Sequence, residues 1–404
     1  MATFSAVLGD ISPYIFIPLL LSLVDFITII RSRFYKAESV SSETKDCRSF
    51  TILIPIFGNM RYLKNVGFLS QYPGQVILCT TTKETSEFYS QIESIAQRFN
   101  FSVYRSRVPI ASSKHKPNPW RLFSNTLTGG RESADNVEKH ILSEEARDEI
   151  IREGSQSVKT EYSIFIDGDT VTDQSLGKLT GLMKQKEFDL SSVRVLASKQ
   201  DTIMEKLQSV EYEFAMDARK IYPWLTSGAA MIAKTHIIRE IMKHHSLFFS
   251  GGDIEIGKLA KILGFNVGHI AFPFYTDVPE TFRAWFKQRM AWFGGGFRHA
   301  VINMHKYSWK HPMHFFYFTV LVYLLAPVRW YEVVRHPLVL LLVILIYWVL
   351  IFLFHWKRLR YFYILFPFYA LIQIMILVPL GVYTYFKMAL ASQNTGAIKL
   401  RNLD

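Results

Sequence analysis

The stretch YSIFIDGDTV, residues 162–171, places an apolar segment directly before two aspartates that are separated by one glycine. The apolar residues predict a buried strand, and Gly168 allows the backbone to turn at its end. In an extended chain, residues i and i+2 point the same way, so Asp167 and Asp169 would present two carboxylates on one side. Because like charges at such a short separation repel each other, we expect a positive group between them.

The surrounding residues, 48–278, alternate between strand-like and helix-like patterns. Helical patterns occur at 86–99 and 144–158, between predicted strands. This alternation indicates an α/β fold with a mostly parallel sheet and helices on both faces, and such sheets bind ligands beyond the carboxyl ends of their strands. The predicted strands are FTILIPIF (50–57), GQVILCTT (74–81), FSVYRSRV (101–108), YSIFIDGD (162–169) and DLSSVRVL (189–196).

The chain is more apolar than a purely soluble protein. Half of its 404 residues are hydrophobic, and 32 Phe, 20 Tyr and 8 Trp contribute to this excess. Long apolar runs predict membrane spans at 11–30, 314–330, 336–356 and 361–386. The basic segment after the first run orients the following domain toward the cytoplasm. We therefore expect a multi-pass protein of the cell membrane with a transmembrane anchor (1–33), a cytoplasmic α/β domain (48–278), interfacial amphipathic helices (279–312), three transmembrane helices (313–388) and a tail (389–404).

Charge and cysteine content narrow the function classes. The formal net charge of +12 suits nucleic acid, anionic lipid headgroups or phosphorylated substrates. The basic residues gather at the membrane edges and not on one soluble face, which argues against nucleic-acid binding. Cys47 and Cys79 form neither a disulfide framework nor a metal motif, which fits a reducing compartment.

Acidic residues at two places in the α/β domain are suited to chemistry. Asp167 and Asp169 would offer hard oxygen ligands to Mg²⁺ or Mn²⁺ shared with a diphosphate, and a solvated turn with two acids is the alternative. Asp253 opens a helix pattern over 250–264, where an acid caps the helix and suits its dipole. A carboxylate fixed at such a place is also well positioned to act as a general base.

Residues 281–300, TFRAWFKQRMAWFGGGFRHA, mix arginine and lysine with aromatic residues. This composition is typical of an amphipathic helix that lies in the membrane interface. Gln288, Arg289 and Trp292 would lie close together on one face of the helix. Arginine can clamp a phosphate and a flat indole can stack on a sugar ring, so this face is a candidate binding surface.

Three motifs, taken in chain order, resemble those of family 2 glycosyltransferases, the membrane-bound group that includes the cellulose, chitin and hyaluronan synthases. They are FIDGDTV (165–171), GGDIE (251–255) and QRMAW (288–292). The resemblance covers about residues 50–305 and implies a GT-A-type fold. It also implies an inverting, metal-dependent transfer of a sugar from a nucleotide-diphosphate sugar, with Asp253 as the catalytic base.

The same resemblance assigns further roles to single residues. It implies that Asp167 and Asp169 bind the metal ion. It implies that the nucleotide sugar is bound by Asp167, Gln288, Arg289 and Thr80, and that the acceptor is bound by Trp292, Ser227 and Gly228. Two departures affect this assignment. Thr80 stands where the family usually has aspartate, and Ala291 stands where it has arginine, which leaves Arg289 as the candidate for the diphosphate contact.

The implied donor is a UDP-sugar, and the implied acceptor is open between two classes. One is a growing polysaccharide, exported between the spans of the enzyme itself. The other is a lipid in the bilayer that receives a single sugar. Four spans would form a thin channel wall, so the first class favours homo-oligomers. An inactive transporter or binding protein is a third interpretation, and only the two departures from the family pattern support it.

Overall fold

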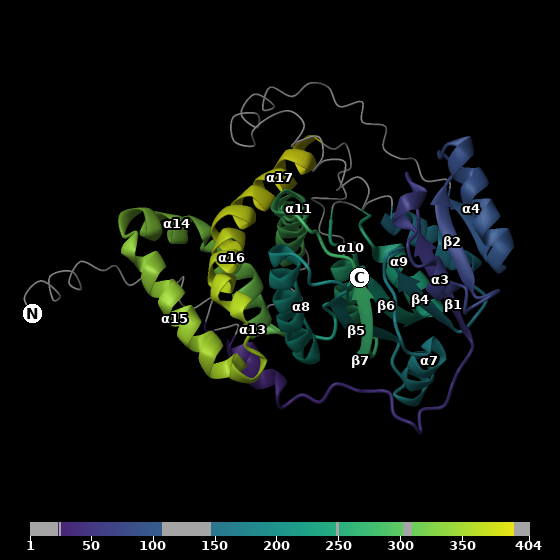
Figure 1. The fold of residues 1–404 in the computed structure, drawn as a ribbon, viewed down its shortest axis with the longest axis horizontal. Helices are drawn as coiled ribbons and strands as arrows, with labels where there is room; N and C mark the ends of the chain where they lie inside the picture. Colours follow the sequence, from purple (N-terminus) through teal and green to yellow (C-terminus); the bar gives the residue numbers. More distant parts are fainter. Residues whose placement is uncertain (1–22, 24–25, 107–146, 248–249, 302–308, 392–404) are drawn as a thin grey trace, which may run out of the picture.

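A seven-stranded sheet lies at the centre of the computed structural model, in the order β3-β2-β1-β4-β6-β5-β7. The structure describes residues 23, 26–106, 147–247, 250–301 and 309–391 (Figure 1). Neighbouring strands are parallel except where β6 pairs with β4 and β5. The strands are β1 (Phe50–Pro55), β2 (Val76–Thr81), β3 (Ser102–Ser106), β4 (Tyr162–Ile166), β5 (Leu190–Ala197), β6 (Ala230–Lys234) and β7 (Val267–Thr276). The predicted α/β fold and all five predicted strands are confirmed, and the sequence did not predict β6 and β7.

Helices cover both faces of the sheet because its strands are apolar on both sides. Along β1, Ile52 and Ile54 belong to one apolar core and Leu53 belongs to the other, and all three are fully buried. Burial of each such side chain contributes roughly 1.5–3 kcal/mol. The first face carries α3 (Val66–Leu69), α4 (Ser86–Phe99), α7 (Leu176–Gln185) and part of α8 (Ile203–Ile221), and the second carries helical residues 147–157, α9 (Thr235–His244) and α10 (Gly252–Ile262).

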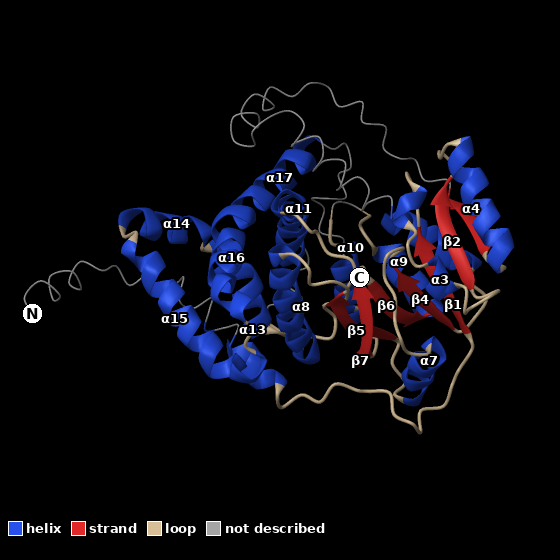
Figure 2. Cartoon of the chain, viewed as in Figure 1, coloured by secondary structure: helices blue, strands red, loops and turns tan. Residues whose placement is uncertain are grey.

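A third apolar core joins α8 and α11 (Phe282–Val301) to the C-terminal helices. Figure 2 shows the sheet on one side, the C-terminal helices on the other, and α8 and α11 between them. Met216 of α8 packs in the core on the first face of the sheet, whereas Met204 and Leu207 of the same helix pack in the third core. The C-terminal elements are α13 (Pro312–Phe315), η3 (Phe316–Leu324), α14 (Ala326–Arg335), α15 (Leu338–His355), η4 (Trp356–Arg358), η5 (Tyr361–Leu365), α16 (Phe366–Ile372), η6 (Gln373–Leu377) and α17 (Val378–Ala391).

By length and composition, one continuous helical stretch of the described chain could cross a membrane, Tyr361–Met388, with a mean hydropathy of 2.1. The predicted span at 314–330 is not straight, because it bends by 52° between Leu324 and Ala326, just before Pro327. If the bent pair is one span, the number rises to two. Residues 340–355 form an apolar helix that is shorter than a span. Most of the predicted span at 11–30 lies outside the described residues.

Three consecutive glycines, Gly294–Gly296, let three elements touch the backbone of α11. A Cβ atom on Gly295 would lie 2.3 Å from the carbonyl oxygen of Ser250, which precedes α10, and one on Gly296 would lie 2.3 Å from the Tyr323 hydroxyl of η3. On the third side, a Cβ atom on Gly381 of α17 would lie 2.6 Å from the amide nitrogen of Gly294. Since each glycine in a helix interior costs about 1 kcal/mol relative to alanine, close packing is the compensating gain.

Gly295→Ala tests this packing, with Gly67→Ala in α3 as its control. Nothing lies within 4 Å of a Cβ atom at Gly67, so that change should stabilise the protein by about 0.5–1 kcal/mol through helix propensity. Gly295→Ala should instead destabilise it by about 1–3 kcal/mol, because the backbone at Ser250 cannot give way as a side chain can. Denaturant unfolding of the purified protein measures both, and a stabilising Gly295→Ala would contradict the packing argument.

Candidate functional site

The two acids of the opening stretch lie directly after β4, at the carboxyl end of the strand. The turn between them is held by Gly168, whose carbonyl accepts hydrogen bonds from the amides of Lys64 (2.7 Å) and Asn65 (3.1 Å). A Cβ atom on Gly168 would lie 2.7 Å from the Tyr62 carbonyl oxygen, so glycine is required here for close approach. Asp167, Gly168 and Asp169 all line one large cavity, as the sequence predicted for a site at a strand end.

Asp169 has the environment of a cation ligand. Burial, followed by the nearby charges of Asp167 and Asp277, raises the pKa of its carboxyl group to about 6. Two neutral hydroxyls, from Thr170 and Thr276, donate hydrogen bonds of 3.2 Å to it. In the described part of the chain, no group of three or more His, Cys, Asp and Glu side chains is placed to hold a metal ion. A cation bound by Asp167 and Asp169 would therefore take its other ligands from water or from a substrate phosphate.

Asp167 has a side-chain cation as its partner, which the sequence interpretation missed. Arg147, at the start of the helical residues 147–157, lies 3.1 Å from the Asp167 Oδ1 atom and donates a 2.5 Å hydrogen bond to the Gly228 carbonyl. It also lies 3.6 Å from Asp148. Burial lowers the pKa of Arg147, but the charges of Asp167, Asp148 and Asp253 outweigh it, so the pKa lies above its usual value. Arg147 thus remains charged and joins Asp167 to the loop at Gly228.

Asp253 occupies the first turn of α10, as predicted, next to the loop that contains Ser227 and Gly228. The Gly228 amide donates a 2.7 Å hydrogen bond to Asp253 Oδ2, and the Thr226 hydroxyl donates one to the Asp253 carbonyl. Gly251 precedes the helix in a left-handed conformation with φ of 87°, which glycine adopts without strain. The structure therefore brings the predicted base and the predicted acceptor loop together.

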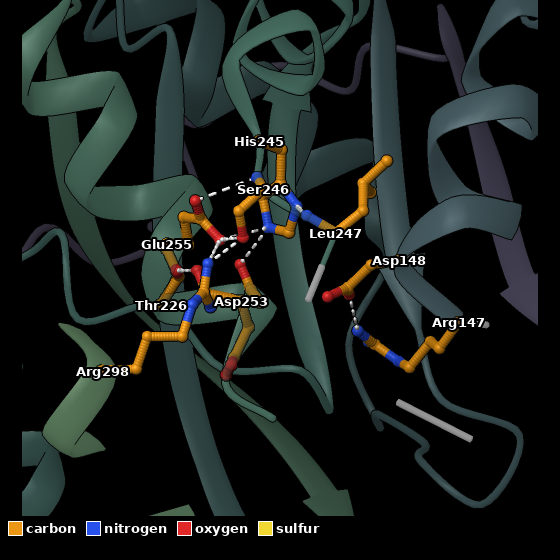
Figure 3. Close-up of polar contacts among 10 residues, drawn as sticks. Arg147, Asp148, Thr226, His245, Ser246, Leu247, Asp253, Glu255 and Arg298 are labelled. Atoms are coloured by element: carbon orange, nitrogen blue, oxygen red, sulfur yellow. Dashed lines mark hydrogen bonds and ion pairs between the residues drawn. The ribbon is translucent and has the colours of Figure 1, made fainter. Parts of the chain in front are cut away.

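A buried polar network supports the helix turn that carries Asp253 (Figure 3). Glu255 accepts hydrogen bonds from Arg298 of α11 (2.6 Å) and from the hydroxyl of Ser246 (2.8 Å). The His245 ring lies 3.4 Å from the same carboxylate and 3.0 Å from the Gly252 carbonyl. Burial alone would raise the pKa of Glu255. Arg298 and His245 act in the opposite direction and outweigh burial, so the pKa falls to about 2. The network fixes the start of α10 against α11.

The three predicted residues of α11 are adjacent, as expected, but Arg289 is already engaged. Its guanidinium pairs with Glu211 of α8 at 2.9 Å, donates to Gln288 at 2.7 Å, and lies 4.0 Å from the centre of the Trp292 ring. Arg289 is 1% exposed, whereas Trp292 is 37% exposed. Contacts within the protein thus already engage the guanidinium of Arg289, which the sequence interpretation made the candidate for the diphosphate contact. Trp285 is buried as well, with its indole donating to Tyr369.

One cavity of about 1230 Å³ connects these residues. Among the residues that line it are all the predicted site residues except Thr80, namely Asp167, Asp169, Ser227, Gly228, Asp253, Gln288, Arg289 and Trp292. Thr80 is fully buried within β2, between β1 and β3, and its hydroxyl has no hydrogen-bond partner among the described residues. The position of Thr80 in the structure therefore does not support its predicted role in binding the nucleotide. Apolar side chains of η3, α15 and α16 also line the cavity.

Comparison with known proteins gives a family match and structural matches at low sequence identity. The model of the glycosyl transferase family group 2 matches residues 163–383. A search of curated protein sequences found no match. The mannosyltransferase PcManGT from Pyrobaculum calidifontis, solved with GDP-Man and Mn²⁺, superimposes with a TM-score of 0.54 at 10% identity, over 92% of this chain and 99% of that protein. The S. aureus TarS 1-349 structure reaches only 0.35, at 12% identity, over 62% of this chain and 64% of that protein.

The match to PcManGT shows the GT-A-like fold, with its seven-stranded, mostly parallel sheet. The family match begins in β4 and ends in α17, so it includes both acids after β4, the first turn of α10 and the whole of α11. Because it covers more than half of the chain, the protein belongs to the glycosyl transferase family group 2 and is a glycosyltransferase.

Proposed function

We propose that this enzyme transfers a sugar, with inversion, from a nucleotide-diphosphate sugar to a hydroxyl of a lipid-carried acceptor. The observation that carries the proposal is the lining of one cavity, which combines Asp167, Asp169, Asp253 and the loop at Gly228 with apolar side chains of η3, α15 and α16. A donor with a charged diphosphate suits the polar part of this lining, and an amphiphilic acceptor suits the apolar part.

The chemical step follows from the side chains present. Asp253, oriented by the Gly228 amide, accepts the proton of the acceptor hydroxyl. The acceptor oxygen then bonds to the anomeric carbon as the bond to the diphosphate oxygen breaks, and the nucleoside diphosphate leaves with the electron pair. Arg147 holds Asp167 and the Gly228 loop at a fixed separation, so the donor and the acceptor meet in one geometry.

Asp167 and Asp169 are the residues that would hold Mg²⁺ or Mn²⁺, and the raised pKa of Asp169 supports this. When bound, such an ion neutralises the charge that develops on the leaving diphosphate. PcManGT, with the same fold, was solved with GDP-Man and Mn²⁺, so GDP-mannose stands beside the UDP-sugars as a candidate donor. We assign Gln288 to the diphosphate and Arg289 to the support of Gln288 and Trp292, because Glu211 already binds the Arg289 guanidinium.

The lipid acceptor is favoured over an exported polysaccharide by the number of apolar helices. A channel for a polymer needs a wall of several spans, and the described chain offers one or two. We place the protein on the cell membrane, with the catalytic domain in the cytoplasm, where nucleotide sugars are made. An inactive binding protein has no support from the site, since Asp167, Asp169 and Asp253 all line the cavity.

Asp253→Asn should lower transfer by about 10² to 10⁴-fold while leaving the affinity for nucleoside diphosphate nearly unchanged. Asparagine keeps the shape of the side chain and can still accept from Gly228, but it cannot take a proton. Initial rates with a panel of labelled UDP- and GDP-sugars, together with calorimetric nucleotide binding, measure both quantities. A loss of binding in proportion to the loss of rate would assign Asp253 to the nucleotide site and contradict its role as base.

Asp169→Asn should abolish turnover and yet stabilise the metal-free protein above pH 6 by roughly 2 kcal/mol. Folding raises the pKa of Asp169 from 3.8 to about 6, so the ionised carboxylate destabilises the native state above pH 6, and this effect fades as the pH falls toward 4. Melting in EDTA at pH 8 and pH 4 measures the difference, with exposed Asp173→Asn as control. Full turnover of the wild type in excess EDTA would contradict the metal requirement.

Trp292→Ala should raise the acceptor KM by about 2- to 10-fold, the value of a lost stacking contact, while slow hydrolysis of the donor by water persists. Trp309, which is 89% exposed, provides the matched control, since Trp309→Ala should change neither quantity. The labelled product should extract into organic solvent as a glycolipid. A product that stays at the origin of the chromatogram would instead identify a polysaccharide synthase.

A further inference from the structure

Arg219 of α8 lines the same cavity as Asp253 and Gly228 but takes no part in the mechanism described above. Its Nε atom donates a 2.5 Å hydrogen bond to the Leu225 carbonyl, at the start of the acceptor loop, and its Nη1 atom lies 3.5 Å from the sulfur of Met216. These contacts fix the guanidinium beside the acceptor loop and not beside the acids after β4.

The guanidinium of Arg219 lacks a close anionic partner within the described chain. Its hydrogen bonds go to a carbonyl and a thioether, and no described carboxylate forms an ion pair with it. Burial lowers the pKa of Arg219 to about 10, even though Asp253 and Tyr212 favour its charged form. A half-buried cation without an ion-pair partner is incompletely compensated, so a bound anion would stabilise this site.

The lining of the cavity combines basic and apolar side chains. Two more basic residues, Arg31 and Lys258, line it, and the Arg31 guanidinium donates to the Tyr222 hydroxyl at 3.4 Å. Burial lowers the pKa of Lys258 to about 7. The apolar residues of the lining include Val322, Val343, Ile344, Tyr347, Phe366 and Ala370. At about 1230 Å³ the cavity exceeds the roughly 300–1,000 Å³ of a typical ligand pocket, which leaves room for a second ligand beside the donor.

We propose that Arg219 binds a phosphate on the head group of the lipid acceptor, in a cavity that Arg31 and Lys258 also line. The inference rests on the proposed function and narrows its acceptor to an anionic lipid. The alkyl part lies against the apolar helices, the phosphate meets Arg219, and the acceptor hydroxyl reaches Asp253. A charged hydrogen bond of this kind changes affinity by about 10- to 100-fold.

Binding is measured first, on the full-length protein without donor, so that the result does not depend on turnover. The probes are a neutral alkyl glycoside, the same glycoside with a phosphate on its sugar, and the soluble sugar phosphate without the chain. The wild type should bind the phosphorylated alkyl glycoside at least about 10-fold more tightly than either of the others. Equal affinity for the two alkyl glycosides would overturn the inference, and equal affinity for the two phosphates would overturn the lipid part of it.

Arg219→Gln should bring the ratio of the affinities for the phosphorylated and the neutral alkyl glycoside close to one. Arg219→Lys should retain part of the preference for the phosphorylated glycoside. Arg194→Gln, an exposed arginine of β5, serves as the matched control and should keep the full preference. Nucleoside diphosphate affinity should remain that of the wild type in all three variants. A fall in that affinity for Arg219→Gln would move the residue to the donor site and overturn the inference.

Transfer rates then separate this inference from the proposed function. If Arg219 only orients Asp253, Arg219→Gln should lower transfer equally for the charged and neutral acceptors, which would overturn the inference. If the protein binds the phosphorylated glycolipid as described but neither transfers nor hydrolyses any donor in the panel, the proposed function fails and the anionic lipid site stands.

Discussion

The buried ion pair between Glu255 and Arg298 determines how the two halves of the molecule meet. Both side chains are removed from water, and Ser246 and His245 add contacts to the Glu255 carboxylate that help to offset the cost of burying it. Glu255 lies two residues after Asp253, and Arg298 lies on the helix that carries Gln288 and Trp292. The pair therefore sets the position of the proposed base relative to the residues across the cavity. Its loss would leave an uncompensated charge in the interior and free α10 to shift.

The sequence predicted the strands with clear apolar character and missed two for identifiable reasons. β6 is short and rich in alanine, which is depleted in strands, and it looked like part of a loop. β7 contains Pro273, which argues against a strand. The structure accommodates this proline at a register shift, where Val193 pairs with Ile270 but Arg194 pairs with Pro273. Pairing with β5 thus holds these residues in a strand even though Pro273 by itself argues against one.

The acids of the site could be predicted because each stands beside a local signal, a strand end for Asp167 and Asp169 and a helix start for Asp253. The cations could not. Arg147 and Arg219 lie within helix patterns that contain many charges, where an exposed side chain is the usual expectation. Only long-range folding brings them to the cavity. The charges on α11 were likewise ambiguous, since arginine with tryptophan suits a membrane interface and a buried ion pair equally well by composition.

The glycine contacts of α11 bear on how an acceptor enters. Backbone meets backbone on two sides of this helix, so no layer of flexible side chains acts as a hinge between the sheet and the C-terminal helices. The two halves cannot separate without losing these contacts, and entry by domain opening is disfavoured. The lipid acceptor proposed above would instead reach Asp253 through the apolar part of the cavity. Its supply would then depend on lateral diffusion, and the rate of the enzyme would follow the surface density of the lipid in the bilayer and not its bulk concentration.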